Sequence, residues 1–224
     1  MGRIKNKIIR TIYKKEEITR LPVRLVSEKM GCDRGTPIDR YYIENFLNAN
    51  QTDIRGSVME IGGRLYTKKY GTNVKHSYVF TADKKRKNAI VGDLTTGEGC
   101  QENILDCFIL TQTLPFMYDI HSAVQNIVKM LKKNGVALVT VGGISMISKY
   151  DEARWGHYWG FTKQSLQLLF RPYVDEKNIM IMSYGNAKTA AAFLYGLCQQ
   201  DLCREDFLYN DELVPVVLCA KIVK

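Results

Sequence analysis

The fold class of this chain is restricted most by an apolar run that ends in an acidic residue and two glycines, Val58-Met59-Glu60-Ile61-Gly62-Gly63. A second apolar run is followed by Gly92-Asp93-Leu94. In an α/β protein such positions lie at the carboxyl ends of neighbouring parallel strands, where ligands of open sheets bind. Glycine lets a nucleoside-sized ligand approach the backbone, and nearby carboxylates accept hydrogen bonds from ribose hydroxyls. The pattern predicts a nucleoside-cofactor site, and therefore an enzyme.

Segments with strand and helix patterns alternate along the rest of the chain. The predicted strands are 57–61, 77–81, 88–91, 105–110, 136–141, 179–183 and 214–222. The predicted helices are 37–47, 65–70, 119–133, 163–170 and 187–197. Thr36 is expected to cap the first helix with Pro37 in its first turn, and Asn134-Gly135 to close the third. This alternation indicates right-handed crossovers and a parallel sheet covered on both faces.

Length and cysteine usage restrict the setting. The 224 residues suit one domain, or one domain with an extension. No apolar run reaches the ~18 residues of a membrane helix or resembles a signal peptide. Six cysteines are scattered without a Cys-x-x-Cys pair, which argues against a zinc site and a disulfide framework. We therefore expect no metal and a reducing, cytoplasmic location.

Residues 1–30 carry +6 of the formal net charge of +9, with nine basic and three acidic side chains. Ile4, Ile8 and Ile12 recur at helical spacing, which predicts a basic amphipathic helix within an extension at 1–33. Such a helix could lie on an anionic membrane surface, giving peripheral membrane contact through residues 1–30, or pack its isoleucines on the protein body. Nucleic-acid binding is not expected, because no known reader motif accompanies the charge.

The nucleotide motifs Gly-x-Gly-x-x-Gly and Gly-x-x-x-x-Gly-Lys-Ser/Thr do not occur. Several segments, in the expected order, instead resemble class I S-adenosylmethionine-dependent methyltransferases. They are Val58 to Gly63 as the first motif, Asp83 after the second strand, Gly92-Asp93-Leu94, Leu105 to Gln112, Leu131 to Leu138, and Tyr150-Asp151 with Trp155 to Thr162. The last stretch is similar to that of methyltransferases associated with glycan and natural-product clusters.

The resemblance covers 34–224 and implies a methyltransferase-like domain there. The implied fold class is α/β: a Rossmann-like, doubly wound, mostly parallel seven-stranded sheet with helices on both faces and an antiparallel last strand. The implied cofactor is S-adenosylmethionine. Its implied binding residues are Glu60, Gly62, Gly63, Tyr66, Asp83, Asp93, Leu94, Thr111 and Gln112, with Arg34 and Tyr42 from the segment before the first strand, which includes Asp39 and Arg40.

The first motif departs from the usual Glu-x-Gly-x-Gly-x-Gly, because Arg64 and Tyr66 occupy its second and third glycine positions. These side chains either crowd the methionine portion of the cofactor, or contact it through the phenol and the guanidinium. The first outcome would favour an alternative function, a degenerate methyltransferase fold that serves as a non-catalytic binding or scaffold module in glycan assembly.

Methyl transfer to oxygen or nitrogen requires positioning of the acceptor and removal of a proton. His157 is the candidate base, and Asp151 is a second base or the residue that orients His157; alternatively His157 only hydrogen-bonds a backbone group. Trp155, Tyr158 and Trp159, with Tyr41, are candidate acceptor-binding residues, although such aromatic side chains can also be core. The expected reaction is O-methylation of a small-molecule, sugar or glycan-precursor hydroxyl.

Overall fold

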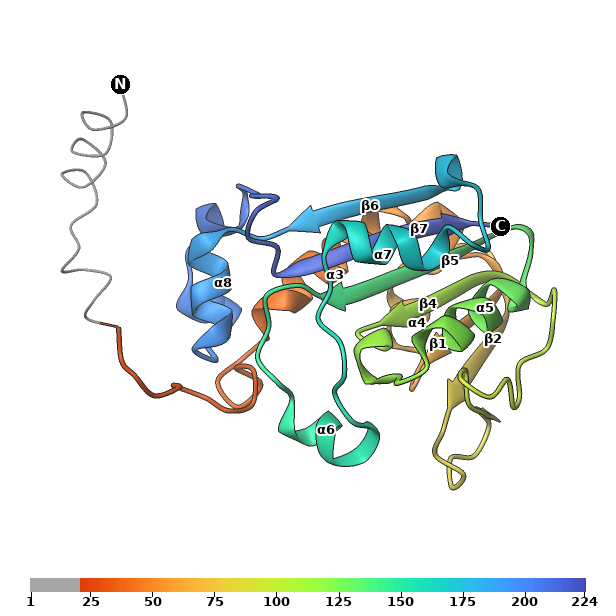
Figure 1. Ribbon diagram of the computed structural model, residues 1–224, viewed down its shortest axis with the longest axis horizontal. Helices are drawn as coiled ribbons and strands as arrows, with labels where there is room; N and C mark the ends of the chain where they lie inside the picture. Colours follow the sequence, from red (N-terminus) through yellow and green to blue (C-terminus); the bar gives the residue numbers. More distant parts are fainter. Residues whose placement is uncertain (1–20) are drawn as a thin grey trace.

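The computed structural model describes residues 21–224 (Figure 1). The predicted isoleucine-rich helix falls on residues 1–20, outside the described residues, and stays a prediction. Residues 21–33 run as bends and turns, and the side chains of Leu21, Val23, Leu25 and Val26 are exposed. In the described part of the chain, no helix is both long and apolar enough to cross a membrane.

Seven strands form one sheet in the order β3-β2-β1-β4-β5-β7-β6. The strands are β1 (Gly56–Ile61), β2 (Val74–Thr81), β3 (Ile90–Val91), β4 (Leu105–Thr111), β5 (Leu131–Gly142), β6 (Ile179–Tyr184) and β7 (Val217–Val223). Neighbours from β3 to β5 are parallel, whereas β7 runs antiparallel to both β5 and β6. The predicted sheet, including its antiparallel last strand, is confirmed.

Helices cover both faces of the sheet (Figure 1). They are α3 (Ile38–Ala49), α4 (Leu65–Tyr70), α5 (Ile120–Met130), α6 (Lys149–Trp155), α7 (Lys163–Phe170) and α8 (Ala187–Leu194). The buried residues of α5 and α7 pack in one hydrophobic cluster, and those of α3 and α8 pack in a second. The fold is therefore a three-layer sandwich with a core on each side of the sheet.

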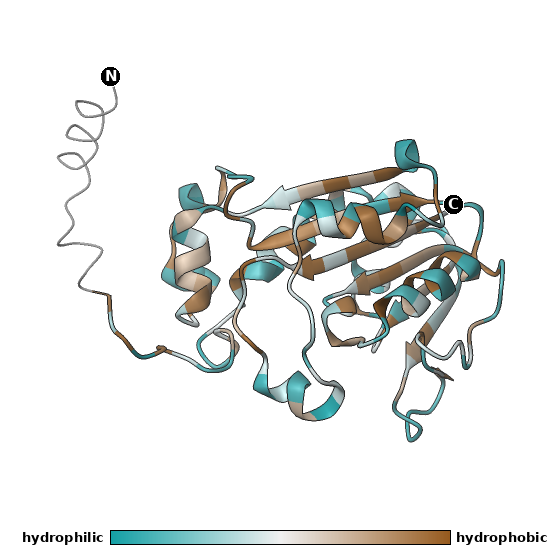
Figure 2. Cartoon of the chain, viewed as in Figure 1, coloured by the Kyte–Doolittle hydropathy of each residue, from teal (hydrophilic) through white to brown (hydrophobic). Residues whose placement is uncertain are grey.

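The strands are apolar on both faces because each face is covered by helices, as is typical of parallel sheets. Along β1, Val58 belongs to the α3/α8 cluster and Met59 to the α5/α7 cluster; along β4, Cys107 and Phe108 divide in the same way. Figure 2 shows the central strands as hydrophobic and the outer turns as hydrophilic. This alternation fixes the register, since a one-residue slip would exchange the two cores.

Two predicted helix ends are wrong, and one helix was not predicted. Thr36 does not cap α3: Pro37 is the N-cap residue, and the Thr36 amide donates to Gln200 Oε1 instead. Helix α5 is not closed by Asn134-Gly135, because Leu131 is already extended and pairs with Leu105 in the sheet. Helix α6, in the stretch after β5, was not among the predicted helices, and Figure 1 shows it set apart from the sheet.

Candidate functional site

Two adjoining cavities lie at the carboxyl ends of β1 and β4. The Asp39 cavity, 440 Å³, is lined by Asp39, Arg40, Tyr66, His157 and Trp159 among others. The Asp93 cavity, 580 Å³, is lined by Asp93, Leu94, Phe80, Trp155 and Tyr158 among others. Both include Ile61, Gly62, Thr111, Gln112, Phe116 and Asp151, so they form one continuous cleft. This is the edge of the sheet predicted from the sequence to bind a ligand.

The glycine turn after β1 forms part of the wall shared by the two cavities. Gly62 has φ +72°, a left-handed conformation that other residues adopt at a cost. A Cβ added there would meet no heavy atom within 4 Å. The side-chain position of Gly62 is therefore open space, and a ligand can lie directly against this backbone.

The Glu60 carboxylate is already hydrogen-bonded by other residues of the protein. Its Oε1 accepts from the Tyr66 amide at 3.1 Å, and its Oε2 accepts from the amide and hydroxyl of Thr67, both at 2.8 Å. These donors lie in the first turn of α4, whose amides lack intrahelical partners. Although Glu60 lines the Asp39 cavity, it is 4% exposed, so its carboxylate anchors the turn as well as facing the cleft.

The two side chains that replace motif glycines leave the cleft open. Arg64 Nη2 donates to the carbonyls of Ser77 and Asn88, at 3.1 and 3.3 Å, and does not line either cavity. Tyr66 is buried at the edge of the Asp39 cavity, where its hydroxyl is hydrogen-bonded to Arg40 Nη1. Burial raises the pKa of Tyr66, opposed by the Arg40 guanidinium.

The Asp93 cavity joins an apolar surface to a polar turn. Asp93 Oδ1 accepts from the amide and hydroxyl of Thr95, both at 2.7 Å. Leu94 is buried, 1% exposed, and Phe80 lies in the same wall. This combination suits a flat ring with polar substituents.

Thr111 and Gln112, the residues at the end of β4, line both cavities, as their position in the sequence predicts. Gln112 has φ +48°, and its amide donates to the Thr140 carbonyl at 2.8 Å. A non-glycine residue in this conformation stores strain, which proteins often retain at binding sites. The turn with this unusual conformation therefore lies within the wall of the cleft.

Ser148 connects the two candidate bases. Its hydroxyl donates to Asp151 Oδ2 at 2.6 Å, and its amide donates to His157 Nδ1 at 3.4 Å. The His157 ring packs edge-on against Phe116, with centroids 5.2 Å apart. Asp151 therefore bonds to Ser148 rather than directly to His157, and the lone pair on Nδ1 of the imidazole is engaged by a backbone amide.

The aromatic residues after β5 are exposed rather than core. Trp155, Tyr158 and Trp159 are 46%, 48% and 40% exposed. Trp159 Nε1 donates to the Met117 carbonyl at 2.9 Å, and Tyr158 packs edge-on against Tyr118. Because all three line the cleft, they offer ring surface to a bound molecule.

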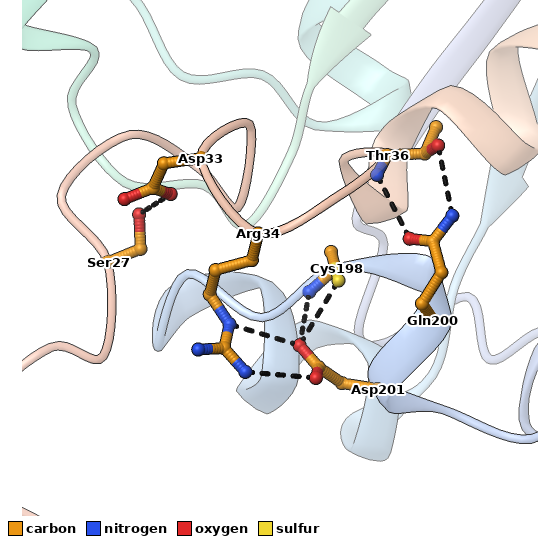
Figure 3. A network of polar contacts seen from close by, with 7 residues as sticks. All are labelled: Ser27, Asp33, Arg34, Thr36, Cys198, Gln200 and Asp201. Atoms are coloured by element: carbon orange, nitrogen blue, oxygen red, sulfur yellow. Dashed lines mark hydrogen bonds and ion pairs between the residues drawn. The ribbon is translucent and has the colours of Figure 1, made fainter.

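Four predicted site residues lie outside the lining of both cavities. Asp83 is exposed and its Oδ1 accepts from the Lys85 amide. Tyr41 packs on Phe207, and Tyr42 is buried with its hydroxyl donating to Thr189 Oγ1. Arg34 is paired with Asp201, in a network with Cys198 that Figure 3 shows. The proposed site does not include these four residues.

Sequence reasoning did not select Ser148, Phe116 or Met117, which shape the cleft. Ser148 carried a usable signal, because a serine three residues before Asp151 is an N-cap pattern, and it does cap α6. Phe116 and Met117 follow Gln112 closely in the sequence, but only the fold turns them toward the cavities.

Comparisons with known proteins agree with the fold. No protein-family model matches the sequence, and no curated protein matches it. Among solved structures, an S-adenosylmethionine-dependent methyltransferase from Archaeoglobus fulgidus is similar, with a TM-score of 0.52, 12% identity, and coverage of 83% of this chain and 94% of that chain. One from Mesorhizobium loti is similar, with a TM-score of 0.51, 10% identity, and coverage of 84% and 98%. The chain thus has the class I methyltransferase fold.

Proposed function

We propose that this protein transfers a methyl group from S-adenosylmethionine to a hydroxyl of a sugar or glycan precursor. The observation that carries the proposal is the continuous cleft, with the bare Gly62 turn between the mainly apolar Asp93 cavity and the more polar Asp39 cavity. The glycan class of the acceptor is supported by the sequence resemblance and by the exposed aromatic residues that line the cleft.

The residues present fit such a cofactor. An adenine ring suits the apolar wall of Leu94 and Phe80, and ribose hydroxyls suit the free capacity of the Asp93 carboxylate. Gly62 offers open space for the chain that links the two cavities, and Arg40 in the Asp39 cavity supplies a cation suited to a carboxylate. When bound, the cofactor supplies an activated methyl group on a sulfonium sulfur.

The acceptor is proposed to enter beside the β5–α7 segment. Trp159 and His157 line the Asp39 cavity, while Trp155 and Tyr158 line the Asp93 cavity. Aromatic faces bind the apolar faces of sugar rings and hold them in one orientation. The contribution of these residues to the reaction is positioning, which brings the hydroxyl into line with the methyl group and excludes water.

The cofactor-free scaffold remains the alternative, and a binding measurement decides between the two. We expect S-adenosylhomocysteine to bind the full-length protein with a micromolar Kd by calorimetry, and Asp93→Ala to weaken it about tenfold. Radiolabelled methyl transfer to a panel of methyl glycosides then tests the acceptor class. Absence of binding to both S-adenosylmethionine and S-adenosylhomocysteine would favour the scaffold.

A further inference from the structure

Asp39 is a buried carboxylic acid, and one of its two side-chain oxygens has no hydrogen-bond partner among the described residues. It lies in the first turn of α3 and is 8% exposed. Its Oδ1 is buried and has no hydrogen-bond partner among the described residues. Burial raises the pKa of Asp39, opposed by the neighbouring Arg40 guanidinium. An unpartnered buried polar atom of this kind is costly and requires an explanation.

The position of Asp39 supplies that explanation, since it lines the cavity that also contains Arg40, His157 and Trp159. A donor on a bound molecule would satisfy this carboxyl group. Solvent does not do so for Oδ1, because that atom is buried. A bound molecule whose donor reaches the carboxyl group would offset the cost of this unpartnered oxygen, as in sites that bind a hydroxyl or an amine.

Other acidic groups of the cleft already have partners. Glu60 accepts three hydrogen bonds from α4, and Asp93 accepts two from Thr95. Asp151 accepts from the Ser148 hydroxyl, and Nδ1 of His157 accepts from the Ser148 amide. A group that takes a proton from an acceptor needs a free lone pair. The other acids keep some free acceptor capacity, but each is oriented by the contacts that it already makes, whereas Asp39 Oδ1, in the first turn of α3, is buried with no partner among the described residues.

We propose that Asp39 is the general base of the reaction, a role that rests on the proposed function and replaces His157 and Asp151. As the bond from the methyl carbon to the acceptor oxygen forms and the bond to sulfur breaks, the hydroxyl proton passes to the Asp39 carboxylate. The products are a methyl ether, an uncharged thioether and a neutral carboxyl group. Charge balances, because the sulfonium and the carboxylate are both neutralised.

The burial of Asp39 suits this role. A carboxyl group in a dry site holds a proton more readily than one in water, which brings it closer to the proton affinity that a base needs near neutral pH. Asp175, by contrast, is an exposed carboxylate at the surface. Arg40 lies beside Asp39 on α3, and its guanidinium opposes the effect of burial on the pKa of Asp39.

The test compares full-length wild-type protein with Asp39→Asn, and with Asp175→Asn as a surface control. Two quantities are measured: the Kd for S-adenosylhomocysteine by calorimetry, and the rate of methyl transfer to the methyl glycoside that wild type uses best. We expect Asp39→Asn to lower kcat at least a hundredfold, to remove the acidic limb of the pH–rate profile, and to change the Kd less than about twofold.

Four other outcomes would contradict the role of Asp39, the acceptor class or the proposed function. A Kd raised tenfold or more in Asp39→Asn would mean that Asp39 holds the cofactor's ammonium group and is not the base. A wild-type rate in that variant would remove Asp39 from the reaction. Cofactor binding by wild type without transfer to any glycoside would contradict the acceptor class and, with it, proton transfer from a sugar hydroxyl to Asp39. Failure of wild type to bind the cofactor would overturn the proposed function itself.

Discussion

The guanidinium of Arg34 donates to both carboxylate oxygens of Asp201, with Nε to Oδ2 at 3.2 Å and Nη2 to Oδ1 at 3.0 Å (Figure 3). Asp201 also accepts from the amide and thiol of Cys198. These contacts lower the pKa of Asp201 to about 2. They attach the segment before α3 to the turn after α8, and so fix the N-terminal start of the helix that carries Asp39.

This attachment predicts a graded response to mutation. Asp201→Ala leaves the Arg34 side chain and the Cys198 amide without their partner, whereas Arg34→Met removes only the ion pair. We expect trypsin cleavage after Arg24 or Lys29 to accelerate more in Asp201→Ala than in Arg34→Met. Asp175→Ala, which loses one lysine partner at 3.6 Å, is the control and should match wild type. Equal cleavage of all four proteins would contradict the attachment.

The stabilisation from Asp201 depends on pH. Because its folded pKa is lowered, the contribution is present above the unfolded pKa of about 3.9 and is lost as pH falls through about 2. We expect the cleavage difference between wild type and Asp201→Ala to persist from pH 5 upward. An acid-stable protease, in place of trypsin, should show the difference disappearing near pH 2.

Gly62 gives a prediction about binding. Gly62→Leu should abolish detectable S-adenosylhomocysteine binding, because the new side chain enters the open space between the two cavities. Gly97 has a similar backbone conformation, φ +83°, and lies outside the lining of both cavities, so Gly97→Leu controls for strain. Each substitution should cost about 1–2 kcal/mol of stability. Calorimetry that finds equal affinities for both variants would rule out ligand contact at Gly62.

Glu60 gives a prediction about stability. Glu60→Ala removes three hydrogen bonds to α4 and should lower the free energy of unfolding by about 3 kcal/mol, since hydrogen bonds to a charged group are among the stronger ones. Glu44→Ala removes an exposed pair with Lys69 and should cost less than about 1 kcal/mol. Urea denaturation measures both. Similar costs would mean that the Glu60 carboxylate does not anchor α4.

The aromatic residues of the cleft should affect the acceptor more than the fold. Trp155 is 46% exposed, so Trp155→Ala should change the free energy of unfolding by less than about 0.5 kcal/mol. Loss of ring stacking should raise the KM for the acceptor about threefold to tenfold. Tyr209 is 66% exposed and lies outside both cavity linings, and Tyr209→Ala should leave KM unchanged. An unchanged KM in Trp155→Ala would exclude stacking on this ring.

The sequence was sufficient to predict the sheet, because a strand buried on two faces is a continuous apolar run and is hard to mistake. The sequence was less informative where the local preference of a residue for a helix end is overridden by a tertiary contact. Asn134-Gly135 has the composition of a helix end, but Leu131 is already extended and pairs with Leu105 in the sheet. Thr36 has the chemistry of a cap, but its amide and hydroxyl are used by Gln200.

The site residues that follow strands could be predicted from the sequence. Those whose side chains are placed by tertiary contacts could not. Gly62, Asp93 and Gln112 follow strands directly, so strand order alone brings them to one edge. Arg34 and Tyr42 have suitable chemistry, but their partners Asp201 and Thr189 are distant in the sequence and are brought near only by packing of α8. Asp39 was noted only among the residues before β1; its burial without a partner has no sequence signature.

The pH dependence of stability tests the burial of Asp39 independently of any role in the reaction. Because its folded pKa is raised by burial, its contribution to stability is fully present below the unfolded pKa of about 3.9 and is lost as pH rises through the folded pKa. Asp39→Asn lacks this loss, so the variant should become more stable relative to wild type as pH rises from 4 to 7, by about 1.4 kcal/mol for each unit of pKa elevation.

The control for this experiment is Asp33, whose contribution to stability changes with pH in the opposite direction to that of Asp39. Asp33 accepts from the Ser27 hydroxyl, and this bond lowers the pKa of Asp33. Its stabilisation is present above the unfolded pKa and is lost as pH falls, so Asp33→Asn should be less stable than wild type at pH 7 and approach it in acid. Urea unfolding at a series of pH values measures both variants. If Asp39→Asn instead lost stability at neutral pH, the Asp39 carboxylate would have a partner in the folded protein, and it could not be the free base of the cleft.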